Sequence, residues 1–377
     1  MKVLHLLDTL AMGGKETFTM SLAGAQQGAG MHAGLATFDP GNAFEGELRE
    51  LQLPWWRFSR KGALDWSLVA SLRKLVADEG FALVHCHGEN PAMYGALAVA
   101  GRPIPLVATI HSGDRDGIRL IIKIQNRFTY LRTNSIVCVS DSIRDRLIRK
   151  EFAPAGKMTT IFNGVTPPRR PEADQAARLR GELSVGPGNL VVACIGRLHP
   201  VKNHLRFLEA FAQARAAESG LVLLMVGDGP LREEVAAKVG ALGIEASVRL
   251  LGTRKDVGHI LAISDIFALP SLNEGHSISL LEACSFGKSI LASNRGGNPG
   301  IVSHGKSGLL VEPGDTEGMA GALIRLAKDP DLRKSLGAEA SKVYRERFSM
   351  ERCLGEYTRL YARLSPAFSA IASGMQA

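Results

Sequence analysis

The stretch DIFALPSLNEGHSISLLEACSFGKSILAS, residues 265–293, contains the pattern that decides the fold. An apolar run ends at Pro270, a short polar loop follows, and a helical segment begins near Ser277 before a second apolar run at 289–293. A strand, a loop, a helix and a further strand in this order are typical of a parallel α/β sheet. Side chains just after the first strand should therefore lie at the carboxyl edge of the sheet, where ligands bind.

Two glutamates in this stretch predict a ligand site. Glu274 lies in the loop and Glu282 lies eight residues later on the helix, which rises only ~1.5 Å per residue. The N–H groups at the helix start, those of His276, Ser277 and Ile278, would favour a negative group between the carboxylates. Such an arrangement suits a sugar diphosphate. From these residues alone, a turn residue and a solvated helix residue are an equally simple interpretation.

A second loop of the same kind occurs in CIGRLHPVKNHLRFLEAF, residues 194–211, where an apolar run stops at Gly196. Arg197 and Lys202 would project from the loop before the next helix. Arginine binds phosphate oxygens with a bidentate fork, and lysine supplies a mobile point charge. The pair predicts an anion site at the carboxyl edge, although an isolated pair of loop cations is also consistent with ordinary solvated residues.

A glycine pair follows the first apolar run of the chain. Gly13 and Gly14 would let backbone N–H groups approach a phosphate at the start of a helix. Neither a P-loop nor a dinucleotide fingerprint is present, so a tight turn explains the pair equally well.

Histidines end two apolar runs of the first half. His111 closes PLVATIH, and an imidazole there can donate a hydrogen bond to a sugar hydroxyl or to developing charge. A purely structural histidine is the alternative. His85 and His87 have no acidic or thiol partner at ligand spacing, so we expect no metal site.

The length of 377 residues predicts two α/β domains. The proline-rich stretch VTPPRRPEADQAA, residues 165–177, separates two halves in which apolar runs and amphipathic segments alternate. We expect two Rossmann-like domains whose sheets face each other across a cleft, followed by a helical segment that returns toward the first domain. The expected N-terminal domain, linker, C-terminal domain and final helical segment are 1–166, 167–171, 172–349 and 350–377.

Periodicity gives the expected elements. Expected strands are 2–8, 32–38, 82–88, 105–111, 135–140 and 159–163 in the first half, and 190–196, 221–227, 248–252, 265–271, 289–293 and 308–313 in the second. Expected helices are 16–27, 65–78, 91–100, 141–151, 203–217, 231–242, 256–263, 277–286, 317–327 and 350–364.

The formal charge of +8 indicates anionic partners. No zinc finger, helix-turn-helix or RNA-binding signature accompanies it, so we expect anionic small ligands or an anionic membrane surface and no nucleic acid. The apolar N-terminus meets Asp8 and a glycine pair instead of a cleavage site, which favours a first strand and a cytoplasmic protein. The five cysteines are widely spaced in apolar runs, which indicates buried thiols.

Taken in order, these segments resemble the retaining glycosyltransferases of family 4, which have the GT-B fold. The resemblance covers nearly the whole chain, and the ordered set carries it rather than any single segment. The segments are Gly13-Gly14, His111, FNGV at 162–165, GRLHPVKN at 196–203, VGDGPLREE at 226–234, RLLGTRKDV at 249–257, the Glu274…Glu282 element and GGNPGIVSHGKSGLLVEPGD at 296–315.

The resemblance implies roles for the donor-site residues. Arg197 and Lys202 would hold the donor diphosphate, together with the backbone at the helix start. Glu282 would accept hydrogen bonds from the ribose hydroxyls, and Glu274 would contact the transferred hexose. Cationic side chains and helix dipoles would stabilise the departing nucleoside diphosphate, so neither a metal nor another cofactor is expected.

The resemblance also implies roles elsewhere in the chain. Gly13 and Gly14 would approach the phosphate from the other domain, and His111 would face the sugar near the reacting carbon. The loop around Thr253 and Arg254 would line the base. The family mechanism is a same-face attack assisted by the leaving phosphate, and no residue is assigned as an enzymatic nucleophile.

Two departures from the family pattern concern the hexose. Gly300 stands where the family often has a glutamate after G-G-x-P, and the run from Glu274 to Ile278 reads EGHSI instead of the common EGFGL. Backbone contacts survive both changes, whereas hexose selectivity is put in doubt.

A basic stretch bears on the class of acceptor that the protein would use. Arg115, Arg119, Lys123 and Arg127 recur every four residues and would form one stripe on a helix within 115–132. A basic amphipathic helix can lie on an anionic membrane, which suits a lipid-linked acceptor. A helix packed on the core with a solvated cationic edge is the alternative.

These features together predict a glycosyltransferase that moves a hexose-type sugar from a nucleoside-diphosphate sugar to a glycan or lipid-linked acceptor, in cell-surface polysaccharide or glycolipid synthesis. A sugar-nucleotide 2-epimerase of the same fold and a non-catalytic nucleotide-sugar-binding protein remain alternatives. A nicotinamide dehydrogenase is disfavoured because no dinucleotide fingerprint follows any expected strand.

Overall fold

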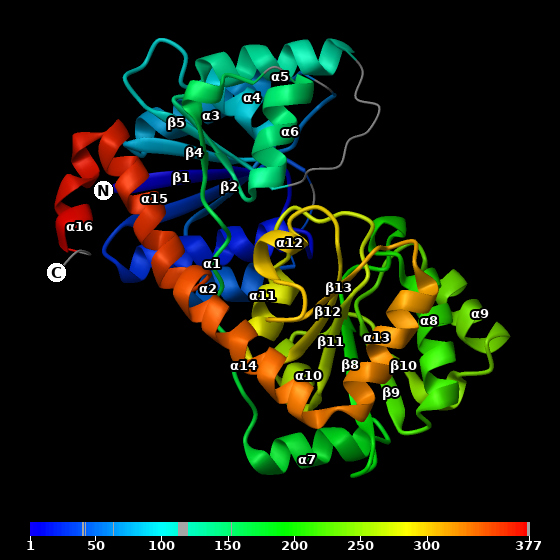
Figure 1. Cartoon of the computed structure of the whole chain (residues 1–377). Helices are drawn as coiled ribbons and strands as arrows, with labels where there is room; N and C mark the ends of the chain where they lie inside the picture. The colour runs from blue at the N-terminus through cyan, green and yellow to red at the C-terminus, as the bar shows by residue number, and fades with distance from the viewer. Residues whose placement is uncertain (40, 42, 63, 112–119, 152, 375–377) are drawn as a thin grey trace. The chain divides into compact units, whose positions relative to one another are not determined.

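The computed structural model describes residues 1–39, 41, 43–62, 64–111, 120–151 and 153–374. Contacts divide the chain into two units, each of which is described by itself (Figure 1). Unit 1 comprises Met1–Val165 together with Ser349–Ala377, and unit 2 comprises Thr166–Phe348. The C-terminal segment therefore packs with the unit that begins the chain.

Unit 1 contains a parallel sheet with the strand order β3-β2-β1-β4-β5-β6-β7. The strands are β1 (Lys2–Leu7), β2 (His32–Thr37), β3 (Trp55–Arg57), β4 (Leu83–His87), β5 (Leu106–Ile110), β6 (Ser135–Cys138) and β7 (Met158–Thr160). The α-helices are α1 (Gly14–Gly28), α2 (Glu45–Glu50), α3 (Trp66–Asp78), α4 (Glu89–Ala98), α5 (Leu120–Arg132), α6 (Asp141–Glu151), α15 (Met350–Leu364) and α16 (Ser369–Gly374).

The central strands of unit 1 are fully covered. Every residue of β4 and β5 is buried, as parallel strands with helices on both faces require. Three of these buried residues, His85, His87 and Thr109, are polar. Buried polar groups need hydrogen-bond partners, so the interior of unit 1 must supply them. Helix α15 packs against α1 and buries Tyr357 and Tyr361 on its inner face.

Unit 2 contains a second parallel sheet with the order β10-β9-β8-β11-β12-β13. The strands are β8 (Leu190–Ile195), β9 (Leu221–Val226), β10 (Val248–Leu250), β11 (Ile266–Leu269), β12 (Ser289–Ser293) and β13 (Leu309–Val311). The α-helices are α7 (Ala173–Glu182), α8 (His204–Ala217), α9 (Arg232–Ala241), α10 (Val257–Ile263), α11 (Ile278–Ser285), α12 (Asn298–Ile301), α13 (Thr316–Lys328) and α14 (Pro330–Arg347).

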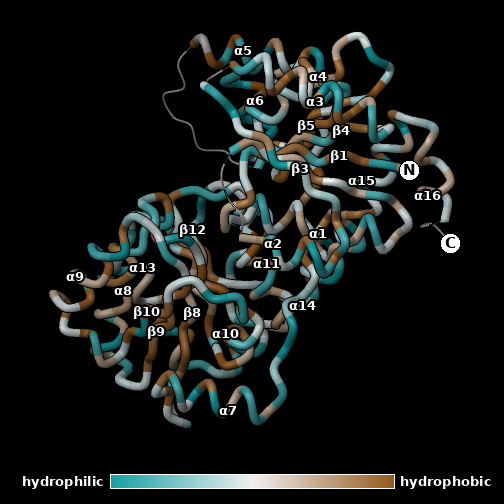
Figure 2. Tube along the Cα trace, turned by 180° about the vertical axis from the view of Figure 1, so that it is seen from behind, coloured by the Kyte–Doolittle hydropathy of each residue, from teal (hydrophilic) through white to brown (hydrophobic). Residues whose placement is uncertain are grey.

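Apolar side chains of the strands and helices form the core of unit 2. Helices α8 and α13 pack together, and Phe207 and Phe211 of α8 are fully buried. In Figure 2 the hydrophobic colouring concentrates on strands such as β8 and β9, and hydrophilic residues lie on the surrounding helices. Among the described helices, none combines the length and apolar character needed to cross a membrane.

The two parallel sheets confirm the predicted α/β class with two Rossmann-like domains. The sequence analysis missed β3, α2, α7, α12 and α14. Strand β3 has three residues at the sheet edge, and α7 buries only Leu179, so neither presents a strong apolar pattern. The expected linker 167–171 has no helix or strand, and the guanidinium of Arg170 lies 4.2 Å from the ring centroid of Phe286 within unit 2.

Candidate functional site

The loop after β8 carries the two predicted cations at the carboxyl edge of the unit 2 sheet. Arg197 is exposed, and within the described part of the chain its guanidinium makes no ion pair. Asn203 adopts a left-handed conformation with φ 57° and donates from its side-chain amide to the carbonyls of Pro270 and Pro313. These bonds fix the loop next to the ends of β11 and β13, so the placement of Lys202 is set by the fold.

Gly227, in the loop after β9, lies against the loop that carries Arg197 and Lys202. Gly227 has φ +131°, and a Cβ there would lie 2.1 Å from the carbonyl oxygen of Gly196. The adjacent backbone also bonds to the loop, since the N–H of Leu198 donates to the carbonyl of Asp228 at 2.9 Å. Gly227 in the VGDGP run at 226–230 therefore has a structural role: it lets this backbone lie close to the loop that holds Arg197.

The structure brings Lys202 and Glu274 together. Lys202 Nζ lies 2.6 Å from Glu274 Oε1, and both side chains are largely buried, at 19% and 11% exposure. Ser271 Oγ donates to the same carboxylate oxygen at 2.6 Å. Sequence reasoning gave the lysine and the glutamate separate roles and missed both the pair and Ser271. A diphosphate that bound Lys202 would compete with Glu274, which would free the carboxylate for a sugar hydroxyl.

The segment after β12 holds the backbone of Glu274. Gly297 N–H donates to the Glu274 carbonyl at 2.8 Å. Gly296 has φ +60°, and a Cβ there would lie 2.2 Å from the Glu274 carbonyl oxygen. Only glycine allows this close approach without a shift of the loop. Gly300, where a glutamate is frequent in the resembled family, is exposed and has open space around its Cβ position.

Helix α11 supplies the second glutamate and the predicted anion-binding N-terminus. Ser277 caps the helix, since its Oγ accepts from Leu280 N–H at 3.4 Å. Ser279 Oγ donates to the carbonyl of Ile195 at 3.0 Å and fixes the helix start beside the end of β8. The N–H groups that precede the cap bond, including that of Ile278, therefore point out of the helix start. Glu282 lies farther along the same helix and is partly exposed.

The side chain of His276 is buried, whereas the prediction concerned only its backbone N–H. Its side chain is 5% exposed, and its ring centroid lies 5.1 Å from that of Phe348 in an edge-on contact. Burial lowers the pKa of His276 to about 3, so the ring is neutral at physiological pH. Only the backbone of His276 belongs to the helix start.

Glu282 should make the stability of the protein depend on pH. Burial raises the pKa of Glu282 from 4.5 to about 7. The native state therefore keeps this proton over a pH range in which the unfolded chain has lost it. We expect the free energy of unfolding to fall as the pH rises from about 4.5 to about 7, by up to about 3 kcal/mol for this group. Denaturant unfolding of the wild type and of Glu282→Gln across this range measures the effect. Parallel pH profiles for the two proteins would contradict it.

Thr253 and Arg254 lie in the loop after β10, at the same edge of the sheet. Arg254 forms a bidentate pair with Asp256, with Nε–Oδ1 at 2.8 Å and Nη2–Oδ2 at 2.5 Å. Hydrogen bonding to Arg254 holds the pKa of the Asp256 carboxyl below its usual range. The pair fixes the loop, and Thr253 remains exposed.

In unit 1, the predicted glycines begin α1 and lie beside an unpredicted cation. Gly13 is the N-cap in an extended conformation, and Gly14 is the first helical residue. Lys15 Nζ lies 3.1 Å from Asp8 Oδ2 and 3.3 Å from Glu16 Oε1. Burial alone would lower the pKa of Lys15, but its attraction to Glu16 and Asp8 outweighs burial and raises it. The sequence analysis assigned Lys15 no role.

His111 follows β5 at the carboxyl edge of the unit 1 sheet, as predicted. Its Nε2 lies 3.1 Å from Nδ1 of His87, and it is partly exposed. Burial, with a smaller contribution from the Lys15 charge, lowers the pKa of His111 to about 3. His111 therefore offers a neutral imidazole to a ligand, not a cation.

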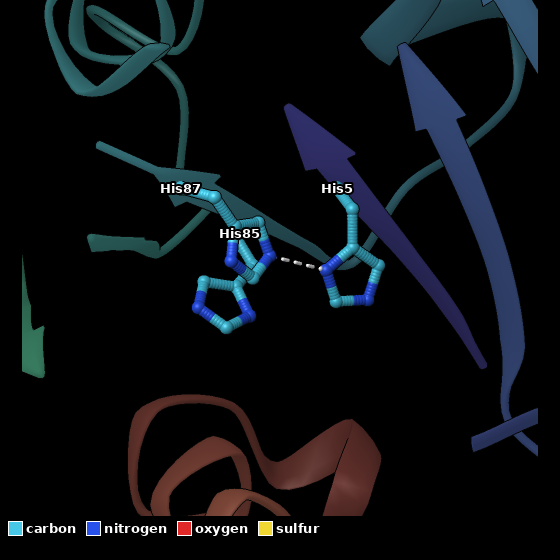
Figure 3. A group of neighbouring side chains, drawn as sticks. All are labelled: His5, His85 and His87. Atoms are coloured by element: carbon cyan, nitrogen blue, oxygen red, sulfur yellow. Dashed lines mark hydrogen bonds between the residues drawn. The ribbon is translucent and has the colours of Figure 1, made fainter. Parts of the chain in front are cut away.

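Behind His111 lies a cluster of buried histidines, with His5 on β1 and with His85 and His87 on β4 (Figure 3). One ligand atom from each lies within 4.8 Å of the others, a spacing that also suits a metal ion. Their ring nitrogens have hydrogen-bond partners instead: Gln26 and His87 for His5, Thr109 and Tyr361 for His85, and His5 and His111 for His87. We therefore interpret the cluster as hydrogen-bonded, and a metal-free protein remains a prediction.

Family models match both units. The model described as Glycosyltransferase Family 4 matches residues 12–169, and the model described as Glycosyl transferases group 1 matches residues 177–343. An α-1,3-galactosyltransferase of Escherichia coli, named for UDP-Gal and α-D-GlcNAc-diphosphoundecaprenol, is 30% identical over 71% of this chain and 72% of its own length. N-acetyl-α-D-glucosaminyl L-malate synthase of Bacillus anthracis is 28% identical over 79% and 78%.

Solved structures share the fold. HepE of Anabaena, in complex with UDP and glucose, superposes with a TM-score of 0.87 at 23% identity, covering 96% of this chain and 100% of its own. Sucrose-phosphate synthase from Thermosynechococcus elongatus gives a TM-score of 0.80 at 19% identity, covering 96% of this chain and 98% of its own. At these identities the likeness concerns the fold alone, which is that of two Rossmann-like domains.

Proposed function

Because this chain belongs to glycosyltransferase family 4, with the GT-B fold, we propose that it is a retaining enzyme that moves a hexose-type sugar from a nucleoside-diphosphate sugar to a glycan or lipid-linked acceptor. The observation that carries this proposal is the pair of Lys202 and Glu274 beside the N-terminus of α11. A cation, helix N–H groups and a carboxylate at one sheet edge match the phosphate and hydroxyl groups of such a donor.

In this proposal unit 2 holds the donor. Lys202 and the exposed Arg197 neutralise the diphosphate, and the N–H groups at the start of α11 bind its oxygens. Glu282 accepts hydrogen bonds from the ribose hydroxyls. Glu274, released from Lys202 by the diphosphate, accepts a hydrogen bond from a hydroxyl of the sugar. The loop containing Thr253 and Arg254 contacts the base.

Catalysis then depends on charge stabilisation of the leaving group. As the glycosidic bond breaks, negative charge grows on the diphosphate oxygen that faces the fixed cations, so their interaction with the ligand strengthens in the transition state. The acceptor hydroxyl attacks the same face of the sugar and transfers its proton to the leaving phosphate. We further propose that the reaction needs no bound metal, because fixed cations and N–H dipoles supply the positive charge.

The name of one relative and the ligands of one solved structure with the same fold support the choice of substrates. The E. coli relative is named for a UDP-sugar and a diphosphoundecaprenol-linked acceptor, and HepE was solved with UDP and glucose. The test is release of nucleoside diphosphate from candidate nucleotide sugars, measured with and without acceptor and with excess chelator. We expect acceptor-dependent release that the chelator leaves unchanged. Isomerisation without release would favour an epimerase, and the absence of any turnover would favour a binding protein.

Helix α5 supports association of the enzyme with an anionic membrane, where a lipid-linked acceptor would lie. Leu120, Ile124 and Phe128 are 68%, 60% and 55% exposed and recur every four residues, so they share one face. Arg132 lies over the Phe128 ring at 3.5 Å. An exposed face with both apolar and basic side chains suits the boundary of an anionic bilayer. Of the predicted basic stripe, Arg115 and Arg119 lie outside the described residues.

We therefore expect the protein to float with anionic vesicles and to be released by salt. The variant with both Ile124→Glu and Phe128→Glu should lose this binding and keep its activity on a water-soluble acceptor. Trp66→Glu is the matched control, since Trp66 is an exposed aromatic residue on α3. Flotation that ignores lipid charge would contradict binding to an anionic surface, and flotation that survives both α5 changes would exclude α5 as the membrane contact.

A further inference from the structure

A continuous chain of hydrogen bonds leads from a buried amide to the exposed end of the unit 1 sheet. Gln26 Oε1 lies 2.7 Å from His5 Nε2, His5 Nδ1 lies 2.9 Å from His87 Nε2, and His87 Nδ1 lies 3.1 Å from His111 Nε2. Gln26, His5 and His87 are completely buried, whereas His111 is partly exposed. The chain thus connects the interior of unit 1 to its candidate carbohydrate-binding edge.

With the carbonyl oxygen of Gln26 facing His5 and its amide nitrogen facing Tyr361, the chain fixes the position of each ring proton. The carbonyl oxygen of Gln26 can only accept, so Nε2 of His5 must donate. A neutral imidazole has one N–H, so Nδ1 of His5 is an acceptor and Nε2 of His87 donates to it. By the same step, Nδ1 of His87 accepts from Nε2 of His111. What remains at the exposed end is the unprotonated Nδ1 of His111, which has no hydrogen-bond partner among the described residues.

A second branch leaves from the amide nitrogen of Gln26. Gln26 Nε2 donates to the hydroxyl of Tyr361 at 3.3 Å. That hydroxyl lies 2.7 Å from Nδ1 of His85 and can donate to it, which would leave Nε2 of His85 to donate to Thr109 Oγ1 at 2.7 Å. Rotation of the amide by 180° would reverse the donors in both branches together. The direction at His111 is therefore coupled to a residue of the C-terminal helix α15.

We propose that Gln26, acting through His5 and His87, holds His111 as a hydrogen-bond acceptor at Nδ1, so that His111 recognises a carbohydrate hydroxyl by accepting its hydrogen. This proposal rests on the proposed function and refines it, since the sequence analysis expected the imidazole to donate. Gln26 is a positioning residue here, because it acts on the ligand only through the two histidines between them.

The electrostatics of the cluster keep the rings neutral, so each ring carries a single N–H. Burial lowers the pKa of His5 to about 4 and the pKa values of His85 and His87 well below 6.5. The charged group that acts on His111 is Lys15, whose positive charge further disfavours protonation of this ring. A lone pair at the exposed end and a nearby cation both favour a ligand hydroxyl that donates to His111.

The first test reads the tautomers of the wild-type protein without any substrate. Long-range ¹H–¹⁵N correlation spectra of protein labelled at histidine distinguish protonation at Nδ1 from protonation at Nε2. We expect His5, His87 and His111 all to carry the proton at Nε2. Protonation of His111 at Nδ1 would overturn the inference. The measurement does not involve glycosyl transfer, so its outcome is separate from the acceptor-dependence test of the proposed function.

The second test removes the amide. Gln26→Leu should give His111 a mixture of both tautomers and lower kcat/KM by about tenfold, the scale of one hydrogen bond. Gln27→Leu is the matched control, since the neighbouring Gln27 bonds instead to the N–H of Ala33. Tyr361→Phe should also mix the tautomers, because it removes the hydrogen-bond partner of the Gln26 amide nitrogen. If His111 stays uniformly protonated at Nε2 in both variants, Gln26 does not set its tautomer.

Discussion

Replacement of Lys202 by alanine should lower turnover at least about a hundredfold, which corresponds to about 3 kcal/mol of transition-state stabilisation. The change removes the cation that would neutralise the leaving diphosphate. It also leaves the carboxylate of Glu274, which is only 11% exposed, without its cationic partner, while Ser271 Oγ still donates to it. An uncompensated buried carboxylate at this position would repel the diphosphate. Steady-state kinetics with saturating acceptor measures the loss.

Two further variants separate these contributions. Lys238→Ala is the matched control, because Lys238 pairs with Glu209 in the same unit but lies on α9. It should leave turnover unchanged. Adding Glu274→Gln to Lys202→Ala should restore part of the affinity for nucleoside diphosphate, since it removes the repulsive charge, without restoring turnover. Near-normal rates in both Lys202→Ala and Glu274→Gln would refute the donor-site assignment.

Replacement of Gly296 by alanine should lower activity by tenfold or more although Gly296 itself contacts no ligand in this account. The residue has φ +60°, and the new Cβ would lie 2.2 Å from the carbonyl oxygen of Glu274. The loop that carries Glu274 must then shift, and the strained backbone costs about 1–3 kcal/mol of stability. Activity at a temperature well below the unfolding transition, measured beside thermal unfolding, separates the two effects.

Gly300→Ala provides the control for this change. Gly300 lies in the same segment, but its Cβ position has no neighbour within 4 Å. The substitution should leave both stability and turnover close to those of the wild type. Equal losses in the two variants would mean that the segment, rather than its contact with Glu274, determines activity.

The strands and their ligand-bearing ends could be predicted from sequence because they depend on local patterns. Buried parallel strands appear as apolar runs, and the residue that follows such a run lies at the carboxyl edge of the sheet. This reasoning placed Arg197, Lys202, Glu274 and His111 just after strands, where the structure has them. It also predicted α11, and only the exact bounds differ.

What the sequence did not reveal are contacts between residues far apart in the chain. Lys202 and Glu274 are separated by 72 residues, and Gln26 and Tyr361 by 335. Each side chain alone is consistent with an ordinary surface or core residue. His5 lies within an apolar strand and gives no separate signal, although three histidines in the runs of β1 and β4 could have prompted a search for partners. Only the parallel pairing of β1 with β4, which sets His5 opposite His85, brings the rings together.

The position of a bound nucleoside diphosphate would test the account most directly. A crystal structure of the protein with a nucleoside diphosphate should show the diphosphate oxygens within hydrogen-bonding distance of Lys202 Nζ and the Arg197 guanidinium, with Glu274 displaced from the lysine and the ribose at Glu282. A diphosphate bound away from these residues, with the Lys202–Glu274 pair intact, would contradict it.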